Sequence, residues 1–395
     1  MLPPLRLRKN EERRLRAGHL WVFSNEVDVA ATPLTSFQPG DAVEVQDSRG
    51  APIGAGYVNP RSLICARLVS RDSRRPLSAG LLEQRLSRAL KLRETLFGGE
   101  PFYRLVFGEA DGLPGLVVDR FGSILVAQVT TAGMERHRDD LVAALAALPG
   151  ITGVQLRNDT GSRDLEGLES YVETAHGAVP DRVEIMENET RFSVPISGGQ
   201  KTGWFYDHRL NRARLRRYAP GSRVLDLFSY IGGWGIQAAT AGAREVVCVD
   251  SSASALEELD RSAALNGVEQ KMSSRRGDVF DVLARLREEK ERFDIVVIDP
   301  PAFIKRRKDQ KQGEKAYQKI NRLAMELLVP DGVLFSASCS HHLTRDALLL
   351  AMLRAGREIG RDLQILEQGH QGPDHPIHPA IPETEYLKAF TARIS

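Results

Sequence analysis

Four short apolar runs, rich in valine and isoleucine, dominate the second half of the chain. They are SRVLDLFSY (222–230), EVVCVD (245–250), FDIVVIDPP (293–301) and GVLFSASCS (332–340). Segments with apolar residues at helical spacing, such as 252–268 and 314–328, lie between them. Because continuous apolar runs joined by crossover helices are typical of buried parallel strands, we expect an α/β domain over residues 196–395.

The first half of the chain predicts two smaller domains. Residues 1–75 hold short strand-like segments separated by turn residues, at 42–46, 53–58 and 63–69, a spacing typical of a small β-barrel. A helix over 77–97, with Ser78 as its cap, opens a central α+β domain at 76–195. There we expect two strands around a Gly/Pro turn within 103–129, a helix over 133–148, and strands at 153–159, 171–174 and 191–195.

Composition narrows the class of protein. Hydrophobic residues make up 42% and charged residues 27% of the 395 positions, as in ordinary globular proteins, and no apolar run approaches the roughly 20 residues of a membrane span. The basic N-terminal segment lacks the apolar centre of a signal peptide. The three cysteines are far apart without a Cys-x-x-Cys pair, so we expect a reducing cytoplasmic location, no membrane contact and no zinc ribbon.

A glycine-rich turn follows the first strand of the α/β domain. In VLDLFSYIGGWG (224–235), Asp226 and Phe228 precede Gly232, and glycines at a strand-to-helix turn let the backbone approach a ligand closely. Asp250 ends the next strand about 20 residues further on, where a carboxylate accepts ribose hydroxyls. A dehydrogenase is disfavoured because the turn departs from G-x-G-x-x-G.

Two more acidic positions extend this series. Asp278, in GDVF, is a candidate partner of an adenine amino group, or simply a helix cap. Asp299 and Pro300, in IDPPAF, end the fourth strand at the carboxyl edge of the sheet, where open α/β sheets bind ligands. The ordered combination resembles the motifs of Rossmann-like methyltransferases that use S-adenosyl-L-methionine (S-adenosylmethionine).

The segment GGQKTGWFYDHRLNR (198–212) mixes glycine with basic and aromatic residues. Lys201, Phe205, Asp207 and Arg209 are candidates for stacking on a base and for holding a carboxylate or phosphate, which predicts a lid. The alternative is the ordinary start of an amphipathic helix.

Cys339 follows the strand after DPP, so it is expected at the same sheet edge as Asp299. Methylation of carbon 5 of a pyrimidine requires a thiolate that adds to carbon 6, and a base, for which Asp299 is the candidate. The alternative for a lone cysteine is buried filler, which we expect for Cys65 and Cys248. Metal binding by Cys339, His341 and His342 is disfavoured because these ligands are adjacent.

DLFSYIGGWG, IDPPAF, SCSHH, GGQKTGWFYDHRLNR and HPAIPETEYLKAF together resemble the bacterial large-subunit ribosomal RNA cytosine-5 methyltransferase family. The resemblance implies an N-terminal PUA domain, a central α/β domain and a methyltransferase domain. It also implies S-adenosylmethionine as donor, cytosine in large-subunit ribosomal RNA as acceptor, and Cys339 as nucleophile. One departure is Ala302, where the family often has lysine, although Lys305 lies nearby.

RNA binding gives a purpose to two basic runs, 209–217 and 305–315, since Lys and Arg contact phosphates. Arg209, Phe303, Lys305 and His341 are the candidate RNA contacts. Two alternatives stay open: a methyltransferase acting on exocyclic amines, which uses DPP and an aromatic residue without a cysteine, and a non-catalytic RNA-binding protein. The oligomeric state stays open between monomer and homodimer.

Overall fold

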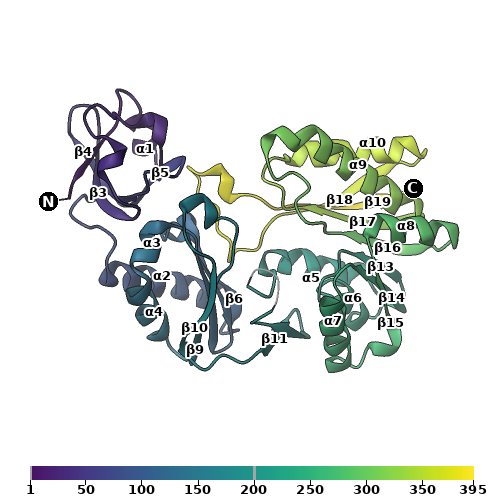
Figure 1. The fold of residues 1–395 in the computed structure, drawn as a ribbon. Coiled ribbons are helices and arrows are strands. Elements are labelled where there is room, and N and C mark those ends of the chain that lie inside the picture. The colour runs from purple at the N-terminus through teal and green to yellow at the C-terminus, as the bar shows by residue number, and fades with distance from the viewer. Residues whose placement is uncertain (1, 199–201) are drawn as a thin grey trace. The chain divides into compact units, whose positions relative to one another are not determined.

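The computed structural model describes residues 2–198 and 202–395, which form two compact units (Figure 1). Unit 1 comprises residues 1–181, 196–204 and 373–384, and unit 2 comprises residues 182–195, 205–372 and 385–395. The division into three domains at 75/76 and 195/196 stays a prediction. No helix in the described part of the chain is long and apolar enough to cross a membrane.

Unit 1 begins with a small β-sheet of order β1-β3-β4-β5-β2. Its buried side chains, among them Leu5, Val43 and Cys65, form a separate hydrophobic core. The predicted strands in this region are confirmed. The elements are β1 (Pro4–Arg6), α1 (Glu12–Arg16), β2 (Trp21–Phe23), β3 (Asp41–Gln46), β4 (Pro52–Val58) and β5 (Ile64–Ser70).

The second sheet of unit 1 has the order β10-β9-β8-β7-β6 and packs against helices. The Ser78 side chain caps α2 by accepting a hydrogen bond from the backbone N–H of Leu81, as predicted. The elements are α2 (Ala79–Phe97), β6 (Phe102–Phe107), β7 (Leu116–Phe121), β8 (Ile124–Val129), α3 (Ala132–Arg136), α4 (Arg138–Ala146), β9 (Gly153–Asn158) and β10 (Tyr171–Gly177).

Two predictions in this sheet are wrong. Residues 102–129 form three strands and not two, because a second turn at Gly122, with φ of +68°, folds β8 back onto β7. The helix expected over 133–148 is divided at His137, where φ is −101° and the backbone leaves the helical conformation. Both interruptions are single-residue events inside otherwise regular patterns.

Unit 2 is built on a sheet of order β15-β14-β13-β16-β17-β19-β18 (Figure 1). Neighbours from β15 to β17 run parallel, whereas β19 is antiparallel to both β17 and β18. The strands are β13 (Arg223–Leu227), β14 (Glu245–Asp250), β15 (Met272–Arg276), β16 (Phe293–Ile298), β17 (Leu328–Ser338), β18 (Leu363–Gly369) and β19 (Lys388–Ile394).

Helices cover this sheet, and a hairpin packs beside it. Ser193 of the hairpin donates its backbone N–H to Ser262 Oγ of α7 (3.0 Å). The helices are α5 (Arg209–Tyr218), α6 (Gly235–Thr240), α7 (Ala253–Leu265), α8 (Val279–Glu288), α9 (Gln310–Glu326) and α10 (Arg345–Glu358), and the hairpin is β11 (Arg182–Glu187) and β12 (Thr190–Pro195). The predicted α/β domain with a mainly parallel sheet is confirmed, as is the small β-domain at the N-terminal end.

Candidate active site and cofactor site

The turn after β13 adopts a conformation that ordinary residues avoid. Phe228 and Tyr230 have φ of 61° and 49°, in the left-handed region that is costly for residues other than glycine. Gly232 has φ of +84°, and a Cβ there would lie 2.8 Å from Ile236 Cδ1. Tyr230 N–H donates to Asp250 Oδ2 (2.9 Å), which fixes the turn against β14. Strained backbone held by its surroundings is typical of a ligand-binding loop.

Asp226 lies beneath this turn and is completely buried. Its Oδ2 accepts from Gly235 N–H (2.9 Å), and its Oδ1 has no hydrogen-bond partner among the described residues. Burial, with the nearby Asp299 and Asp250 carboxylates, raises the pKa of Asp226 to about 8, despite the hydrogen bond from Gly235. An orphaned buried carboxyl oxygen beside a glycine turn fits the cationic methionine part of S-adenosylmethionine.

Asp250 is the last residue of β14, and Asp278 lies just after β15. Asp250 is half-buried, and its two oxygens accept from the backbone N–H groups of Tyr230 and Ser252 (2.9 Å each). A carboxylate keeps further lone pairs for ribose hydroxyls after such bonds. Asp278 is exposed and caps α8, accepting from Phe280 N–H (2.8 Å), so the capping role considered for it is present. Its contact with adenine stays a prediction.

The predicted lid segment divides into described and undescribed parts. Lys201 lies outside the described residues. The Phe205 ring meets that of Tyr230 edge-on at 5.5 Å, which places Phe205 beside the turn between β13 and α6 (residues 228–234), here called the cofactor turn. Asp207 is buried and accepts from the Tyr386 hydroxyl (2.6 Å). Both residues therefore lie within the framework that shapes the site.

The position of Arg209 argues against its predicted contact with RNA. Its side chain is 7% exposed, and its Nε lies 3.7 Å from Glu187 Oε2. Arg212, on the same helix, binds this carboxylate through both oxygens (2.6 and 3.1 Å). The first turn of α5 therefore uses its arginines to neutralise a buried glutamate, which a basic run in the sequence does not reveal.

Asp299 is held by two residues that the sequence did not single out. Trp234 Nε1–H donates to Oδ2 (3.0 Å), and His208 Nε2 lies 3.1 Å from Oδ1. Burial favours neutral forms of both partners, but their mutual attraction outweighs it, raising the pKa of His208 and lowering that of Asp299. The ion pair stabilises the fold at pH values between the pKa of Asp299 and the pKa of His208. Its contribution is lost as pH rises through the pKa of His208, and also as pH falls through the pKa of Asp299.

The DPP loop carries an aromatic cluster. Pro300 is buried, and the half-buried Phe303 packs on Tyr317 with ring centres 4.9 Å apart. The rings of Phe228 and Phe280 lie 6.3 and 6.4 Å from that of Phe303. Lys305 follows on the exposed surface. Phe303 thus connects the cofactor turn to the helix that supports the cysteine loop.

The cysteine loop is fastened through the two serines that flank Cys339. Ser338 and Ser340 are fully buried, and both bond to the Tyr317 hydroxyl (2.8 and 2.9 Å). Ile304 N–H of the DPP loop also donates to Ser340 Oγ (3.3 Å). Cys339 itself is half-buried. The loop therefore turns its hydroxyls inward and leaves the sulfur-bearing residue the most exposed of the three.

The other cysteines differ sharply from Cys339. Cys65 and Cys248 are completely buried, and burial raises the pKa of Cys65 to about 12 and that of Cys248 well above its usual value.

His341 is exposed, with its ring 5.7 Å from that of Tyr386. Among the described residues, no group of three or more His, Cys, Asp or Glu is arranged to hold a metal ion.

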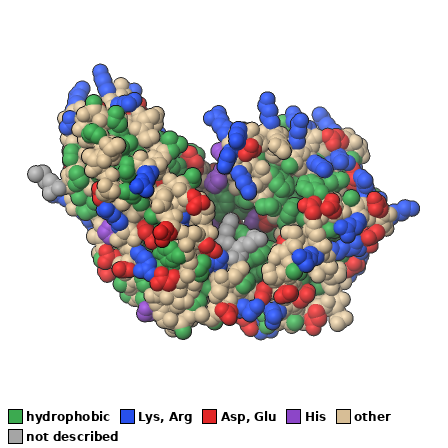
Figure 2. Space-filling model, viewed as in Figure 1, with side chains coloured by type: hydrophobic (Ala, Val, Ile, Leu, Met, Phe, Trp, Pro, Cys, Tyr) green, Lys and Arg blue, Asp and Glu red, His purple; other side chains and the backbone are tan. Residues whose placement is uncertain are grey.

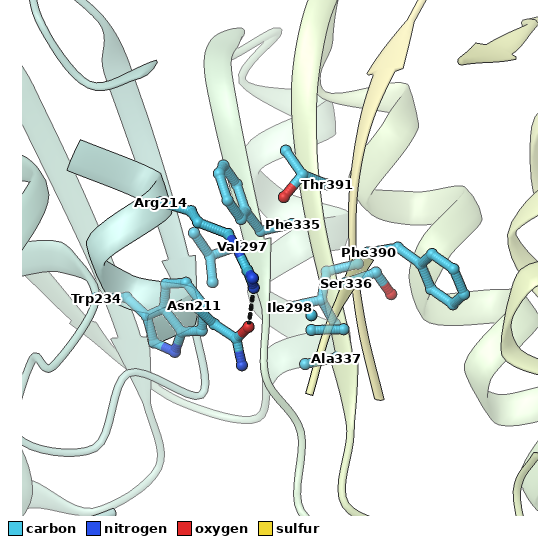
Figure 3. Close-up of a pocket in the computed structure, with 12 residues that line it drawn as sticks. Asn211, Arg214, Trp234, Val297, Ile298, Phe335, Ser336, Ala337, Phe390 and Thr391 are labelled. Atoms are coloured by element: carbon cyan, nitrogen blue, oxygen red, sulfur yellow. Dashed lines mark hydrogen bonds between the residues drawn. The ribbon is translucent and has the colours of Figure 1, made fainter. Parts of the chain in front are cut away.

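A cavity lies on the α5 side of the sheet, beside Trp234 (Figure 3). On α5, Arg214 donates to Asn211 Oδ1 (2.8 Å), and it pairs with Glu367 (3.2 Å). Its floor is formed by β16, β17 and β19, through residues that include Val297, Phe335 and Thr391. Since the arginine is already neutralised, this cavity offers no free charge for an anionic ligand.

Comparison with known proteins adds the family. A model of S-adenosylmethionine-dependent methyltransferases matches residues 149–390, and a PUA-like domain model matches residues 5–71. Ribosomal RNA large subunit methyltransferase I of Cronobacter sakazakii is 38% identical, with 98% of each chain covered. The protein of the same name from Shewanella denitrificans is 37% identical over 99% of each. The chain belongs to the ribosomal RNA large subunit methyltransferase I family.

Solved structures confirm the fold of this methyltransferase. A putative S-adenosylmethionine-dependent methyltransferase from Streptococcus mutans has a TM-score of 0.84 at 20% identity, covering 99% of this chain and 100% of that chain. A putative methyltransferase in complex with SAH has a TM-score of 0.85 at 21% identity, with the same coverage. The predicted cofactor, S-adenosylmethionine, is confirmed by the family.

Replacing Asp226 with Asn is expected to raise the stability of the fold at pH 8 and to weaken cofactor binding. Because the folded state favours the protonated carboxyl, the wild type loses stability as pH rises from about 4 towards about 8, whereas Asn stays neutral. Thermal unfolding at pH 8 should shift upward, by about 2–4 °C per kcal/mol recovered. Calorimetry should show S-adenosylmethionine binding weakened about tenfold or more, as a desolvated charge partner is lost. The control Asp250→Asn should weaken binding without stabilising; unchanged affinity in Asp226→Asn would contradict this assignment.

Replacing Tyr317 with Phe is expected to loosen the cysteine loop. The change removes the hydroxyl shared by Ser338 and Ser340, at a cost of about 1–3 kcal/mol in the free energy of unfolding. Urea denaturation measures this cost, and alkylation of Cys339 should become faster as its loop opens. Tyr218→Phe is the matched control, because its hydroxyl bonds Glu367 (2.8 Å). An alkylation rate that rises equally in both variants would refute the role of Tyr317.

Proposed function

We propose that this methyltransferase forms 5-methylcytosine in large-subunit ribosomal RNA, with Cys339 as the covalent nucleophile. The acceptor is supported by relatives at 36–38% identity that are named ribosomal RNA large subunit methyltransferase I. The product rests on one observation: Cys339 is the partly exposed cysteine, and a dedicated set of hydrogen bonds orients its loop.

The sheet topology supports this proposal. Ile298 of β16 pairs in parallel with Ser336 of β17, so Asp299 and Cys339 leave neighbouring strands at the same edge. The Cys339 thiolate adds to carbon 6 of cytosine, and the electron pair of the 5,6 double bond moves to carbon 5. When bound, the cofactor supplies an electrophilic methyl group to that carbon. Loss of the carbon-5 proton then restores the double bond and releases the thiolate.

Asp299 is the proposed acceptor of the carbon-5 proton. His208 and Trp234 keep it ionised, and each takes one oxygen, so the second lone pair of each oxygen remains for the substrate. A carboxylate with a lowered pKa is a weak base in water. The Asp299 side chain is only 23% exposed, so little solvent competes with the substrate for its oxygens. The same two partners fix the orientation of the carboxylate.

An exposed basic segment follows the DPP loop and is the proposed contact with RNA phosphates. Lys305, Arg306, Arg307 and Lys308 are all exposed. Figure 2 shows further Lys and Arg side chains gathered over α9 and α10. Phosphate contacts position an RNA without reading its sequence, so this segment sets affinity. The target cytosine must be unstacked to reach the cysteine loop.

Replacing Cys339 with Ala is expected to abolish methyl transfer while leaving S-adenosylmethionine binding intact. Mass mapping of large-subunit ribosomal RNA from cells that carry only the variant should show one cytosine lacking its methyl group, about 14 Da lighter through one lost transfer. The control Cys65→Ala removes a buried cysteine of unit 1 and should retain activity.

RNA containing 5-fluorocytosine should trap the wild type as a covalent adduct through Cys339, because fluorine cannot leave as the carbon-5 proton does. Near wild-type methylation by Cys339→Ala would instead favour an amine-directed methyltransferase. Absence of cofactor binding in the wild type would favour a non-catalytic RNA-binding protein.

The double variant Lys305→Ala/Arg306→Ala is expected to weaken RNA binding uniformly across sequences. Each lost phosphate contact should reduce the slope of log affinity against log salt by about 0.7 for single-stranded RNA. Filter binding between 50 and 200 mM salt, about the range where such slopes are read, measures this. Lys290→Ala/Arg292→Ala, at exposed positions before β16, is the matched control. Equal slopes in both double variants would exclude the segment as the phosphate contact.

A further inference from the structure

Lys388 is a buried lysine beside the cysteine loop. It opens β19 and lies opposite Ser338, the last residue of β17, in antiparallel register. Its side chain is buried, and Nζ donates to the carbonyl oxygens of Ser340 and Tyr386 (2.7 Å each). The lysine therefore holds the residue directly after Cys339 from the β19 side, while Tyr317 holds both serines from α9.

A buried ammonium is costly unless its charge is compensated. Lys388 forms no ion pair with a carboxylate among the described residues, and two of its three N–H groups are used by carbonyl oxygens. Burial lowers its pKa to about 8, and the Cys339 sulfur is the strongest electrostatic influence in the opposite direction. The cation thus lacks a full counter-charge unless the thiol ionises.

We propose that Lys388 is a positioning residue that stabilises Cys339 as the thiolate, by anchoring its loop through the Ser340 carbonyl and by placing a positive charge beside the sulfur. This inference rests on the proposed nucleophilic role of Cys339. A free cysteine titrates near about 8.5, so only a few per cent is thiolate at neutral pH, and an adjacent lysine increases that fraction.

Other charged groups share this environment and shape its pH dependence. Arg345 at the start of α10 disfavours the charged form of Lys388, whereas Glu385 favours it. The Tyr317 hydroxyl from α9 bonds the serines on either side of Cys339; burial raises the pKa of that phenol, and the Cys339 sulfur adds to the shift. His341 lies on the loop itself. Of these groups, Lys388 is the one that combines burial with a direct hydrogen bond to the backbone of the loop, at the Ser340 carbonyl.

The test compares alkylation of Cys339 by iodoacetamide in wild type, Lys388→Met and Lys388→Arg over a range of pH. Peptide mass mapping follows Cys339 separately, and the buried Cys65 and Cys248 serve as internal controls. In Lys388→Met the midpoint of the alkylation titration should rise by about one pH unit, so that the rate at pH 7, relative to its plateau at high pH, falls about tenfold. The plateau itself reports how far the loop has opened. Lys388→Arg should stay near wild type, as should the control Lys271→Met, at an exposed position.

Wild-type behaviour makes the inference falsifiable even if Lys388→Met does not fold. Alkylation of wild-type Cys339 that titrates like free cysteine would overturn it, as would an unchanged profile in a Lys388→Met variant that still unfolds cooperatively and binds S-adenosylmethionine. The proposed function fails separately: Cys339→Ala would stay active, whatever the alkylation profiles show. Loss of activity in Cys339→Ala with an unchanged Lys388→Met profile would refute only the role of Lys388.

Discussion

Parallel pairing of the central strands of unit 2 is the constraint on which the site depends. Asp226 pairs with Cys248 of β14 and Val297 of β16, and Ile298 pairs with Ser336 of β17. Because all these strands run in one direction, their carboxyl ends deliver the cofactor turn, the DPP loop and the cysteine loop to one edge. A slip of one residue would turn every side chain of a strand to the opposite face and shift its loop relative to the neighbouring loops. The register is therefore fixed by the same apolar residues that make the sheet foldable.

At this edge the protein keeps chemically similar groups in different protonation states. Asp226 is fully buried and Asp299 is half-buried. Burial without a cation raises the pKa of Asp226, whereas His208 and Trp234 outweigh burial and lower the pKa of Asp299. A neutral carboxyl that ionises when a cation arrives suits cofactor binding, and a permanently ionised one suits proton transfer. The cysteines also differ in their surroundings: Cys65 and Cys248 are completely buried, whereas Cys339 is half-buried on a loop whose Ser340 carbonyl accepts from Lys388. Partners, and not residue types, determine these differences.

Local signals in the sequence predicted the strands, the caps and the glycine turn, but not the contacts that complete the site. The Ser78 cap, the parallel strands and the buried state of Cys65 and Cys248 were all confirmed, because each depends on neighbours close in sequence. Trp234 lies 65 residues from Asp299, and Lys388 lies 48 residues from Ser340. Such contacts form only when distant strands assemble, so the spacing of apolar residues along the sequence does not predict them. Arg209 shows the converse: a basic run suggested a surface, whereas folding placed its arginine against a buried glutamate.

The fold alone does not determine which atom is methylated. Nitrogen carries a lone pair and needs only orientation, whereas carbon 5 of cytosine must first be activated by a nucleophile. In this chain two buried serines, a tyrosine hydroxyl and a buried lysine all bear on the loop of one partly exposed cysteine. A cysteine that only filled space would require none of them, so their convergence supports a carbon acceptor over a nitrogen one.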